Sequence, residues 1–263
     1  MTRPDTPRPP RKSRPQKGRP PRKGGDRPDD GAAWIWGHHA AQAALNNPKR
    51  RILEVIATTN TAHALNILHP SLKIADPKTI DSRLPPGAVH QGVALRAEPL
   101  PRVRLEDVAK PAGGVLLVLD GVTDPRNAGA ILRSCAAFGA RGVVMQDRKS
   151  PPLSGGLAKS AVGAAETVPA ATVVNLSKAV TELNERGWLT VALDGEAETA
   201  LPDAIAGHDA VAFVMGSEDK GVRPSVRDAC AVTARIPITD GAESLNVSTA
   251  AAIALYEWSR GRG

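Results

Sequence analysis

The stretch that decides the fold is ARIPITDGAESLNVSTAAAIALYEWSR, residues 234–260. Its pattern predicts a short apolar strand over 236–238, a polar glycine turn over 239–243, and an apolar helix that starts after the turn. A turn between two buried elements presents backbone N–H and C=O groups to a ligand. The start of this helix holds more polar side chains than one N-cap requires, namely Ser244, Asn246, Ser248 and Thr249. The surplus indicates a binding site.

Upstream of this stretch, apolar strands alternate with helices. Continuous apolar runs such as VLLVLD and VAFVMG are typical of strands buried on both faces. We therefore expect an α/β fold with a mainly parallel sheet, helices on both faces, and ligands at the carboxyl ends of the strands. The expected strands are 115–120, 142–146, 173–174, 188–193, 210–215 and 235–238, and the expected helices are 128–138, 159–165, 176–186 and the last one.

A second, smaller α/β module is expected over residues 31–98. There, WIW leads through a glycine into a helix stopped by NNP at 46–48, followed by a strand at 51–58, a helix at 62–68 and a strand at 90–97. His38 and His39 suit RNA contact or a structural hydrogen bond, and the structural role is favoured because no partner cluster accompanies them. Residues 99–114 shift to Pro, Gly and charge, which predicts a linker to a domain over 115–263.

The basic charge is concentrated at the amino terminus. Residues 1–30 hold ten Lys or Arg and four Asp, which accounts for +6 of the net charge of +7. This segment is rich in Pro and has no aliphatic residue beyond Met1, so we expect a disordered tail. It suits an electrostatic arm for phosphates or a solvated terminus that aids solubility, and its large positive excess favours the arm.

Several classes of protein are excluded by missing signals. No apolar run is long enough to span a bilayer, and the start of the chain lacks the apolar core of a secretory signal. Cys135 and Cys230 are isolated, so neither a disulfide framework nor a zinc site is expected, and the cytoplasm is the simplest location. The sequence also lacks a dinucleotide fingerprint, a P-loop and a G-x-S-x-G elbow.

A second polar turn follows the strand at 115–120, in LDGVTDPRNAGAILRSCAAFG. Asn127 is placed to cap the next helix, and Arg133 lies six residues later, about 600° around a helix that begins there. Because its neighbours Ile131 and Cys135 are apolar, Arg133 is expected to be partly covered and to need an anionic partner. A plain N-cap and a surface ion pair are the alternatives for these two residues.

The third polar turn is FVMGSEDKGVRPSVRDAC, residues 213–230. Gly216 allows close approach of the backbone to a ligand, and Glu218 lies between Gly216 and Gly221. A carboxylate in a glycine-flanked turn at a strand end favours a functional role over a solvated charge run. We expect the three turns to converge.

The stretches DPRNAGAILRSCAAFG, FVMGSEDKGV and IPITDGAESLNVSTAAAIALYEW resemble, in order and spacing, the three motifs of the SpoU (TrmH-like) branch of the SPOUT RNA methyltransferases. The resemblance covers residues 115–260. These enzymes transfer a methyl group from S-adenosylmethionine to a ribose 2′-hydroxyl. WIWGHHAAQAALNNPKRRI and HQGVAL are similar to the L30e-like RNA-binding domain of the subgroup that modifies a guanosine of 23S rRNA.

The resemblance implies features that the pattern alone does not. It implies a carboxyl-terminal trefoil knot, a homodimer with the site near its interface, S-adenosylmethionine as cofactor and RNA as partner, with neither metal nor membrane. It implies cofactor contacts at Met215, Gly216, Ile236, Ile238 and Leu245. It places the polar motif positions at Asn127, Arg133, Glu218, Ser244 and Asn246.

The chemistry leaves one step open. Methyl transfer from a sulfonium needs in-line approach of the nucleophilic oxygen, and the protein must also help deprotonate a weakly acidic hydroxyl. A guanidinium is a poor base, so Arg133 either accepts the proton with help from an RNA phosphate, or clamps that phosphate while another group or water accepts. The alternative functions are a tRNA ribose methyltransferase and a non-catalytic RNA-binding ribosome-assembly factor. The intact polar set argues against the latter.

Overall fold

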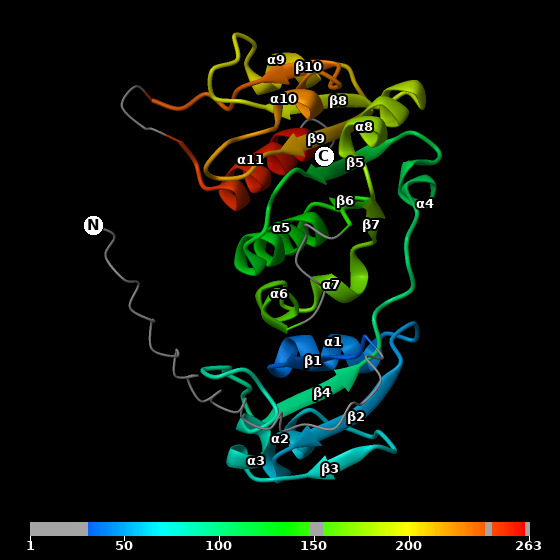
Figure 1. Ribbon diagram of the computed structural model, residues 1–263, viewed down its shortest axis with the longest axis vertical. Coiled ribbons are helices and arrows are strands. Elements are labelled where there is room, and N and C mark those ends of the chain that lie inside the picture. The colour runs from blue at the N-terminus through cyan, green and yellow to red at the C-terminus, as the bar shows by residue number, and fades with distance from the viewer. Residues whose placement is uncertain (1–30, 148–154, 240–243, 261–263) are drawn as a thin grey trace, which may run out of the picture. The chain divides into compact units, whose positions relative to one another are not determined.

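The computed structural model describes residues 31–147, 155–239 and 244–260 (Figure 1). The basic tail expected over 1–30 lies outside the described residues, as do positions 240–243 of the expected polar turn. None of the helices within the described ranges is long and apolar enough to cross a membrane.

The amino-terminal part is built on a mixed four-stranded sheet. Its strands have the order β1-β4-β2-β3, with β4 antiparallel to both of its neighbours and β3 parallel to β2. One face packs Ile35, Val55 and Leu95 against the small residues of α1, and the other face packs Trp36 against Ile80. The elements are β1 (Ala33–Trp36), α1 (His38–Asn46), β2 (Ile52–Ala57), α2 (Thr59–Ala64), β3 (Leu72–Ile74), α3 (Pro77–Asp81) and β4 (Val93–Ala97).

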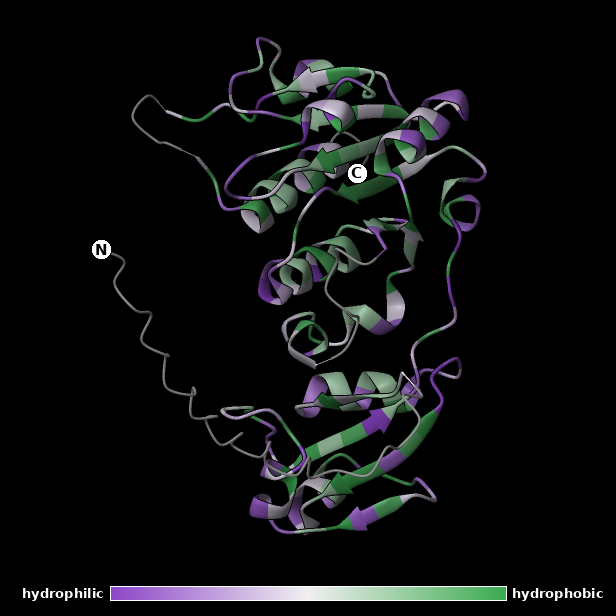
Figure 2. Ribbon diagram, in the orientation of Figure 1, coloured by the Kyte–Doolittle hydropathy of each residue, from purple (hydrophilic) through white to green (hydrophobic). Residues whose placement is uncertain are grey.

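The carboxyl-terminal part is built on a six-stranded sheet in which every pair is parallel. The strand order is β10-β8-β9-β5-β6-β7, so β5 and β9 are central. The central strands β5 and β9 are strongly apolar in Figure 2, in agreement with burial on both faces. They are β5 (Gly114–Leu119), β6 (Gly142–Gln146), β7 (Ala170–Val173), β8 (Leu189–Leu193), β9 (Ala210–Met215) and β10 (Val232–Ala234).

Helices cover both faces of this sheet. One core joins α5, α6, α7, α9 and α11 to one face, and a second core joins α4, α8 and α10 to the other. The expected α/β fold with a mainly parallel sheet is confirmed. The helices are α4 (Leu105–Ala109), α5 (Pro125–Ala137), α6 (Gly155–Ser160), α7 (Ala164–Thr167), α8 (Leu176–Glu185), α9 (Leu201–Ile205), α10 (Pro224–Arg227) and α11 (Val247–Arg260).

The strand expected at 235–238 was placed wrongly, because β10 ends at Ala234. Arg235 turns toward the segment before α9, donating its N–H to Thr199 O (2.9 Å) and accepting from Leu201 N (2.8 Å). Pro237 has no N–H with which to continue a ladder. Ile236 and Ile238 therefore lie in the segment after β10 and not in the strand.

Two helical expectations, the helix at 159–165 and the N-cap at Asn127, differ from the structure, and a helix lies within the expected linker. The helix expected at 159–165 is two short helices, because Val162 and Gly163 have φ of 51° and 90°. The segment 99–114 contains α4, whose apolar residues are buried in the second core. Asn127 is not the N-cap of α5: the helix begins at Pro125, and Asp124 caps it by accepting from Arg126 N at 2.8 Å.

Candidate active site

Side chains from all three polar motifs meet at the carboxylate of Glu218. Its Oε1 accepts from Nδ2 of Asn127 at 2.7 Å and, in a short contact, from Nδ2 of Asn246. Nδ2 of Asn246 also lies 3.3 Å from Oδ1 of Asn127. These residues come from the first turn of α5, the loop after β9 and the start of α11. We call this group the Glu218 triad.

The amide of Asn246 is oriented by the helix that follows it. Its Oδ1 accepts from the backbone N–H of Ser248 at 2.9 Å and of Thr249 at 3.4 Å, and from the hydroxyl of Ser248 at 2.6 Å. The oxygen therefore satisfies the orphan donors of α11, and only the NH₂ group is left to face Glu218. The surplus of polar residues at this helix start thus serves both a cap and the triad.

The loop that carries Glu218 is narrow. Ser217 and Gly221 exchange two backbone hydrogen bonds, of 3.1 and 2.9 Å, which close the loop at its base. A Cβ added at Gly216 would lie 2.0 Å from the carbonyl carbon of Gly221 and 2.2 Å from Val222 N. The backbone passes so close here that only glycine fits.

A cavity of about 410 Å³ lies beside the Glu218 triad. This volume is within the range of small-molecule sites, roughly 300–1,000 Å³. Its lining includes all the residues expected to contact a cofactor, together with two of the polar motif positions: Met215, Gly216, Ile236, Ile238, Leu245, Glu218 and Ser244. A larger cavity of about 960 Å³ is lined by residues of the 97–103 segment and by Arg50 and Glu166, and it includes none of the predicted site residues.

Arg133 does not join the triad. It is exposed on α5, and its guanidinium has no hydrogen-bond or ion-pair partner among the described residues. The expectation of a partly covered position was wrong, because Ile131 and Cys135 turn inward to the core while Arg133 points to the opposite side of the helix. An exposed guanidinium without a carboxylate partner is available to an anion from outside the protein.

Some residues at this end of the sheet were not anticipated. Leu193, Asp194 and Glu196 follow β8 and line the same cavity. The signal was present in the sequence, since DGE directly follows an apolar strand at 194–196. Asp120, which ends VLLVLD, is buried and paired with Arg223.

The cysteines have no place in the chemistry. Burial raises the pKa of the Cys135 thiol to about 12, and burial likewise raises the pKa of Cys230 to about 12. A thiol that stays protonated is neither a nucleophile nor a metal ligand at neutral pH. In the described ranges there is also no group of three or more His, Cys, Asp or Glu side chains that could hold a metal ion.

The sequence from residue 114 to residue 256 matches the model of the SpoU rRNA Methylase family. The chain belongs to this family. Among its relatives, the 23S rRNA (guanosine-2′-O-)-methyltransferase RlmB of Vibrio vulnificus is 37% identical over 242 residues, covering 87% of this SpoU chain and 97% of the relative. The RlmB of Xylella fastidiosa is also 37% identical, over 87% of this chain and 96% of its own.

Solved structures of SpoU methyltransferases share the fold. The enzyme AviRb of Streptomyces viridochromogenes, in complex with AdoMet, superposes with a TM-score of 0.76 at 21% identity, over 88% of this chain and 91% of that one. The AdoMet-bound rRNA methyltransferase of Sinorhizobium meliloti gives a TM-score of 0.76 at 22% identity, over 89% and 88%. The likeness therefore extends over both sheets of the SpoU chain.

Proposed function

We propose that this SpoU chain transfers a methyl group from S-adenosylmethionine to the 2′-hydroxyl of a guanosine ribose in 23S rRNA. The observation that carries the proposal is the Glu218 triad, which joins residues of three separate motifs beside a cavity of about 410 Å³. Relatives of nearly the same length, named for this reaction, support the choice of substrate.

The cavity fits the proposed cofactor. Its apolar side chains, among them Ile236, Ile238 and Leu245, suit the faces of an adenine ring, and the carboxylates of Asp194 and Glu196 suit ribose hydroxyls. Glu218 adds negative charge on the side of the triad, which suits a cationic sulfonium. When bound, S-adenosylmethionine supplies a methyl group already activated by that sulfonium.

The residues of the triad orient rather than transfer protons. Glu218 holds two amides at once, so Asn127 and Asn246 are fixed relative to each other across elements far apart in the sequence. Pre-positioning of this kind supplies rate when the reaction needs in-line approach. Ser244, on the cavity wall, is available as a further hydrogen-bonding group.

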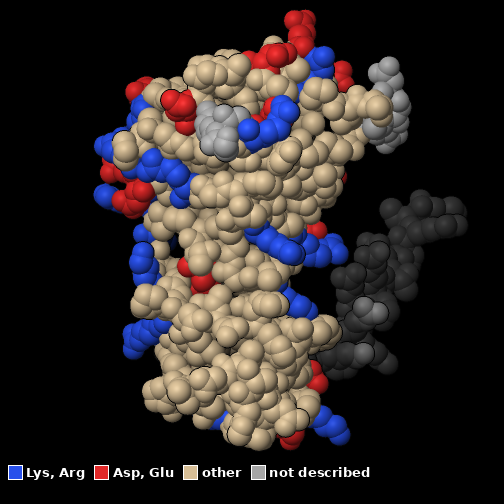
Figure 3. All heavy atoms as spheres, turned by 180° about the vertical axis from the view of Figure 1, so that it is seen from behind, with Lys and Arg blue, Asp and Glu red and all other residues tan. Residues whose placement is uncertain are grey.

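Arg133 is proposed to clamp an RNA phosphate. Its guanidinium is exposed to water, and a guanidinium is a poor base in a protein. On the face of the protein seen in Figure 3, Lys and Arg side chains stand in small groups among mostly uncharged surface. RNA binding by the folded part is therefore proposed to rest on a few placed cations, with the tail adding sequence-independent attraction.

The finer architecture belongs to the same proposal. Residues 31–98 are proposed to be an L30e-like RNA-binding domain, 99–114 a linker that carries α4, and 115–263 the methyltransferase domain with a trefoil knot. The separate four-stranded sheet supports this division. A homodimer acting on RNA in the cytoplasm is proposed from the family resemblance.

Methyl transfer from radiolabelled S-adenosylmethionine to 23S rRNA and to tRNA tests the activity. We expect label in 23S rRNA at one guanosine. The phosphodiester bond that follows this guanosine should resist alkaline hydrolysis, because hydrolysis needs a free 2′-hydroxyl. Label in tRNA alone would replace the substrate by tRNA. RNA binding with no label in either would make the protein a non-catalytic RNA-binding factor. Mapping ribose methylation in cells that lack the protein gives the same decision independently.

A further inference from the structure

Asp120 is a buried carboxylate outside the Glu218 triad. It follows β5, the central strand, and its side chain has no exposed surface. Its two oxygens accept two hydrogen bonds from one residue, Arg223: Oδ2 accepts from the backbone N at 2.8 Å, and Oδ1 accepts from Nε at 2.7 Å. Oδ1 also forms an ion pair with Nη2 of Arg223 at 2.6 Å. A carboxylate buried to this degree needs such compensation, because an unpaired buried charge is strongly destabilising.

The pair extends into a chain of contacts across the carboxyl ends of neighbouring strands. Nη2 of Arg223 donates to Oε1 of Gln146 at 3.1 Å, and Nε2 of Gln146 donates to Val174 O at 3.2 Å. Gln146 ends β6, and Val174 follows β7. Arg223 is thereby held directly at the ends of β5 and β6 and, through Gln146, at the end of β7.

The segment held by these contacts is the loop of the proposed active site. Arg223 follows directly after the 216–222 segment, which carries Glu218 and forms one wall of the 410 Å³ cavity. The entrance of the loop is fixed by β9, where Asp120 N donates to Met215 O at 2.8 Å. Asp120 therefore contacts both ends of the loop, with its backbone at the entrance and its side chain at the exit.

We propose that Asp120 and Arg223 are positioning residues for methyl transfer, which hold the 216–222 loop so that Glu218 meets both asparagines and the cavity keeps its shape. This inference rests on the proposed function, since it names what aligns that same site. Neither side chain touches the Glu218 triad, so both act through the loop.

Asp120→Asn and Arg223→Lys test the pair. Asp120→Asn removes the charge, and Arg223→Lys keeps a cation but loses the planar fork. Misplacing a reacting group by about 1 Å can lower a rate about 10²-fold, so we expect a loss of that order in kcat for Asp120→Asn, with the KM for RNA within about twofold. Binding of S-adenosylhomocysteine, measured by calorimetry, should weaken about tenfold in both variants.

A double variant separates positioning from mere stability. In Asp120→Asn with Arg223→Met, neither partner is charged, so the thermal midpoint should recover toward that of the wild type. The affinity for S-adenosylhomocysteine should not recover, because the 216–222 loop is no longer held by the guanidinium of Arg223. If the affinity for S-adenosylhomocysteine recovers together with the thermal midpoint, the inference is overturned, and the pair contributes only to stability. If Asp120→Asn does not fold, Arg223→Lys alone decides by the same two measurements.

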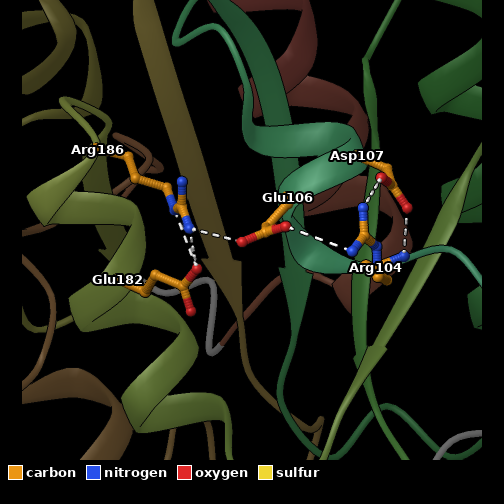
Figure 4. A network of polar contacts seen from close by, with 5 residues as sticks. All are labelled: Arg104, Glu106, Asp107, Glu182 and Arg186. Atoms are coloured by element: carbon orange, nitrogen blue, oxygen red, sulfur yellow. Dashed lines mark hydrogen bonds and ion pairs between the residues drawn. The ribbon is translucent and has the colours of Figure 1, made fainter.

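Arg186 provides the matched control. It lies after α8 in a network of ion pairs with Glu182 and Glu106, in the same part of the protein but away from the cavity (Figure 4). Arg186→Met should lower the thermal midpoint while leaving affinity and rate within about twofold. An equal loss of affinity in this control would refute the inference while the proposed function stands. Wild-type protein that neither binds S-adenosylhomocysteine nor methylates RNA would overturn both.

Discussion

Replacing Arg50 by Met should destabilise the protein far more than the same change at Arg51, its neighbour in the sequence. Arg50 grips Glu166 with two hydrogen bonds, Nε to Oε2 at 3.0 Å and Nη2 to Oε1 at 2.6 Å, and both side chains are almost fully buried, at 2% and 3% exposure. Its Nη1 also donates to Glu98 O at 2.8 Å. The contact joins the segment before β2 to α7.

The expected loss of unfolding free energy depends on which hydrogen bonds Glu166 keeps when Arg50 is replaced. Breaking a buried ion pair by removing one partner costs about 3–5 kcal/mol, because the other charge is left unpaired. Glu166 keeps one donor, Nδ2 of Asn47 at 2.8 Å. We therefore expect a loss of about 3 kcal/mol for Arg50→Met, at the lower end of that range.

The assay is urea denaturation followed by tryptophan fluorescence. Arg51→Met is the control, because Arg51 is 75% exposed and pairs with Glu98 at 3.1 Å in solvent, so its loss should be within about 1 kcal/mol. Adding Glu166→Gln to Arg50→Met removes the unpaired charge and should restore at least half of the loss. Equal losses at Arg50 and Arg51 would refute the reasoning, as would a double variant less stable than Arg50→Met.

Further outcomes are expected at other positions. Gly216→Ala should lower stability by about 3 kcal/mol in thermal unfolding, because its Cβ would overlap the backbone of the same loop. Asn246→Ala should fold and bind RNA but lose methyl transfer, and unchanged turnover would remove this residue from the site. Arg133→Lys should lower single-turnover methylation without shifting its pH profile if the guanidinium clamps a phosphate; a shifted profile would favour a proton-accepting role. Burial raises the pKa values of Cys135 and Cys230 to about 12, whereas the thiols of the unfolded chain lose their protons near pH 9. Between these values the folded chain binds more protons than the unfolded chain. The free energy of unfolding should therefore fall as the pH rises from about 9 to 12. Alkylation by iodoacetamide at pH 8.5 should accordingly be much slower in the native protein than in urea.

The sequence predicted the large sheet well because its strands are apolar on both faces. Runs such as VLLVLD have few alternatives to a buried parallel strand, and β6 and β9 have the predicted bounds. The convergence of three turns was also accessible, since parallel strands end at one edge. Short elements were less accessible: nothing in 159–165 marks Val162 as a left-handed residue, and tertiary contacts decide it.

The site was predictable in its members more than in its contacts. Motif resemblance named Asn127, Glu218 and Asn246 together, but the sequence contains no sign that one carboxylate oxygen serves both amides. The exposure of Arg133 was predicted wrongly from its apolar neighbours. Residues one and two positions away in the sequence lie on a different face of a helix, so their burial does not imply burial of Arg133. Asp120 was overlooked because its partner lies far along the chain, at Arg223.

The strand order has a consequence for how the protein is made. In the small sheet, Ala33 lies opposite Ala97, so that sheet can close as soon as its own residues leave the ribosome. In the large sheet, β5 needs β9, with Gly114 opposite Ala210. At about 5–20 residues per second, the open apolar edge of β5 waits roughly 5–20 s for its partner. A newly made chain is thus most exposed to wrong pairing just before the loop of its active site emerges.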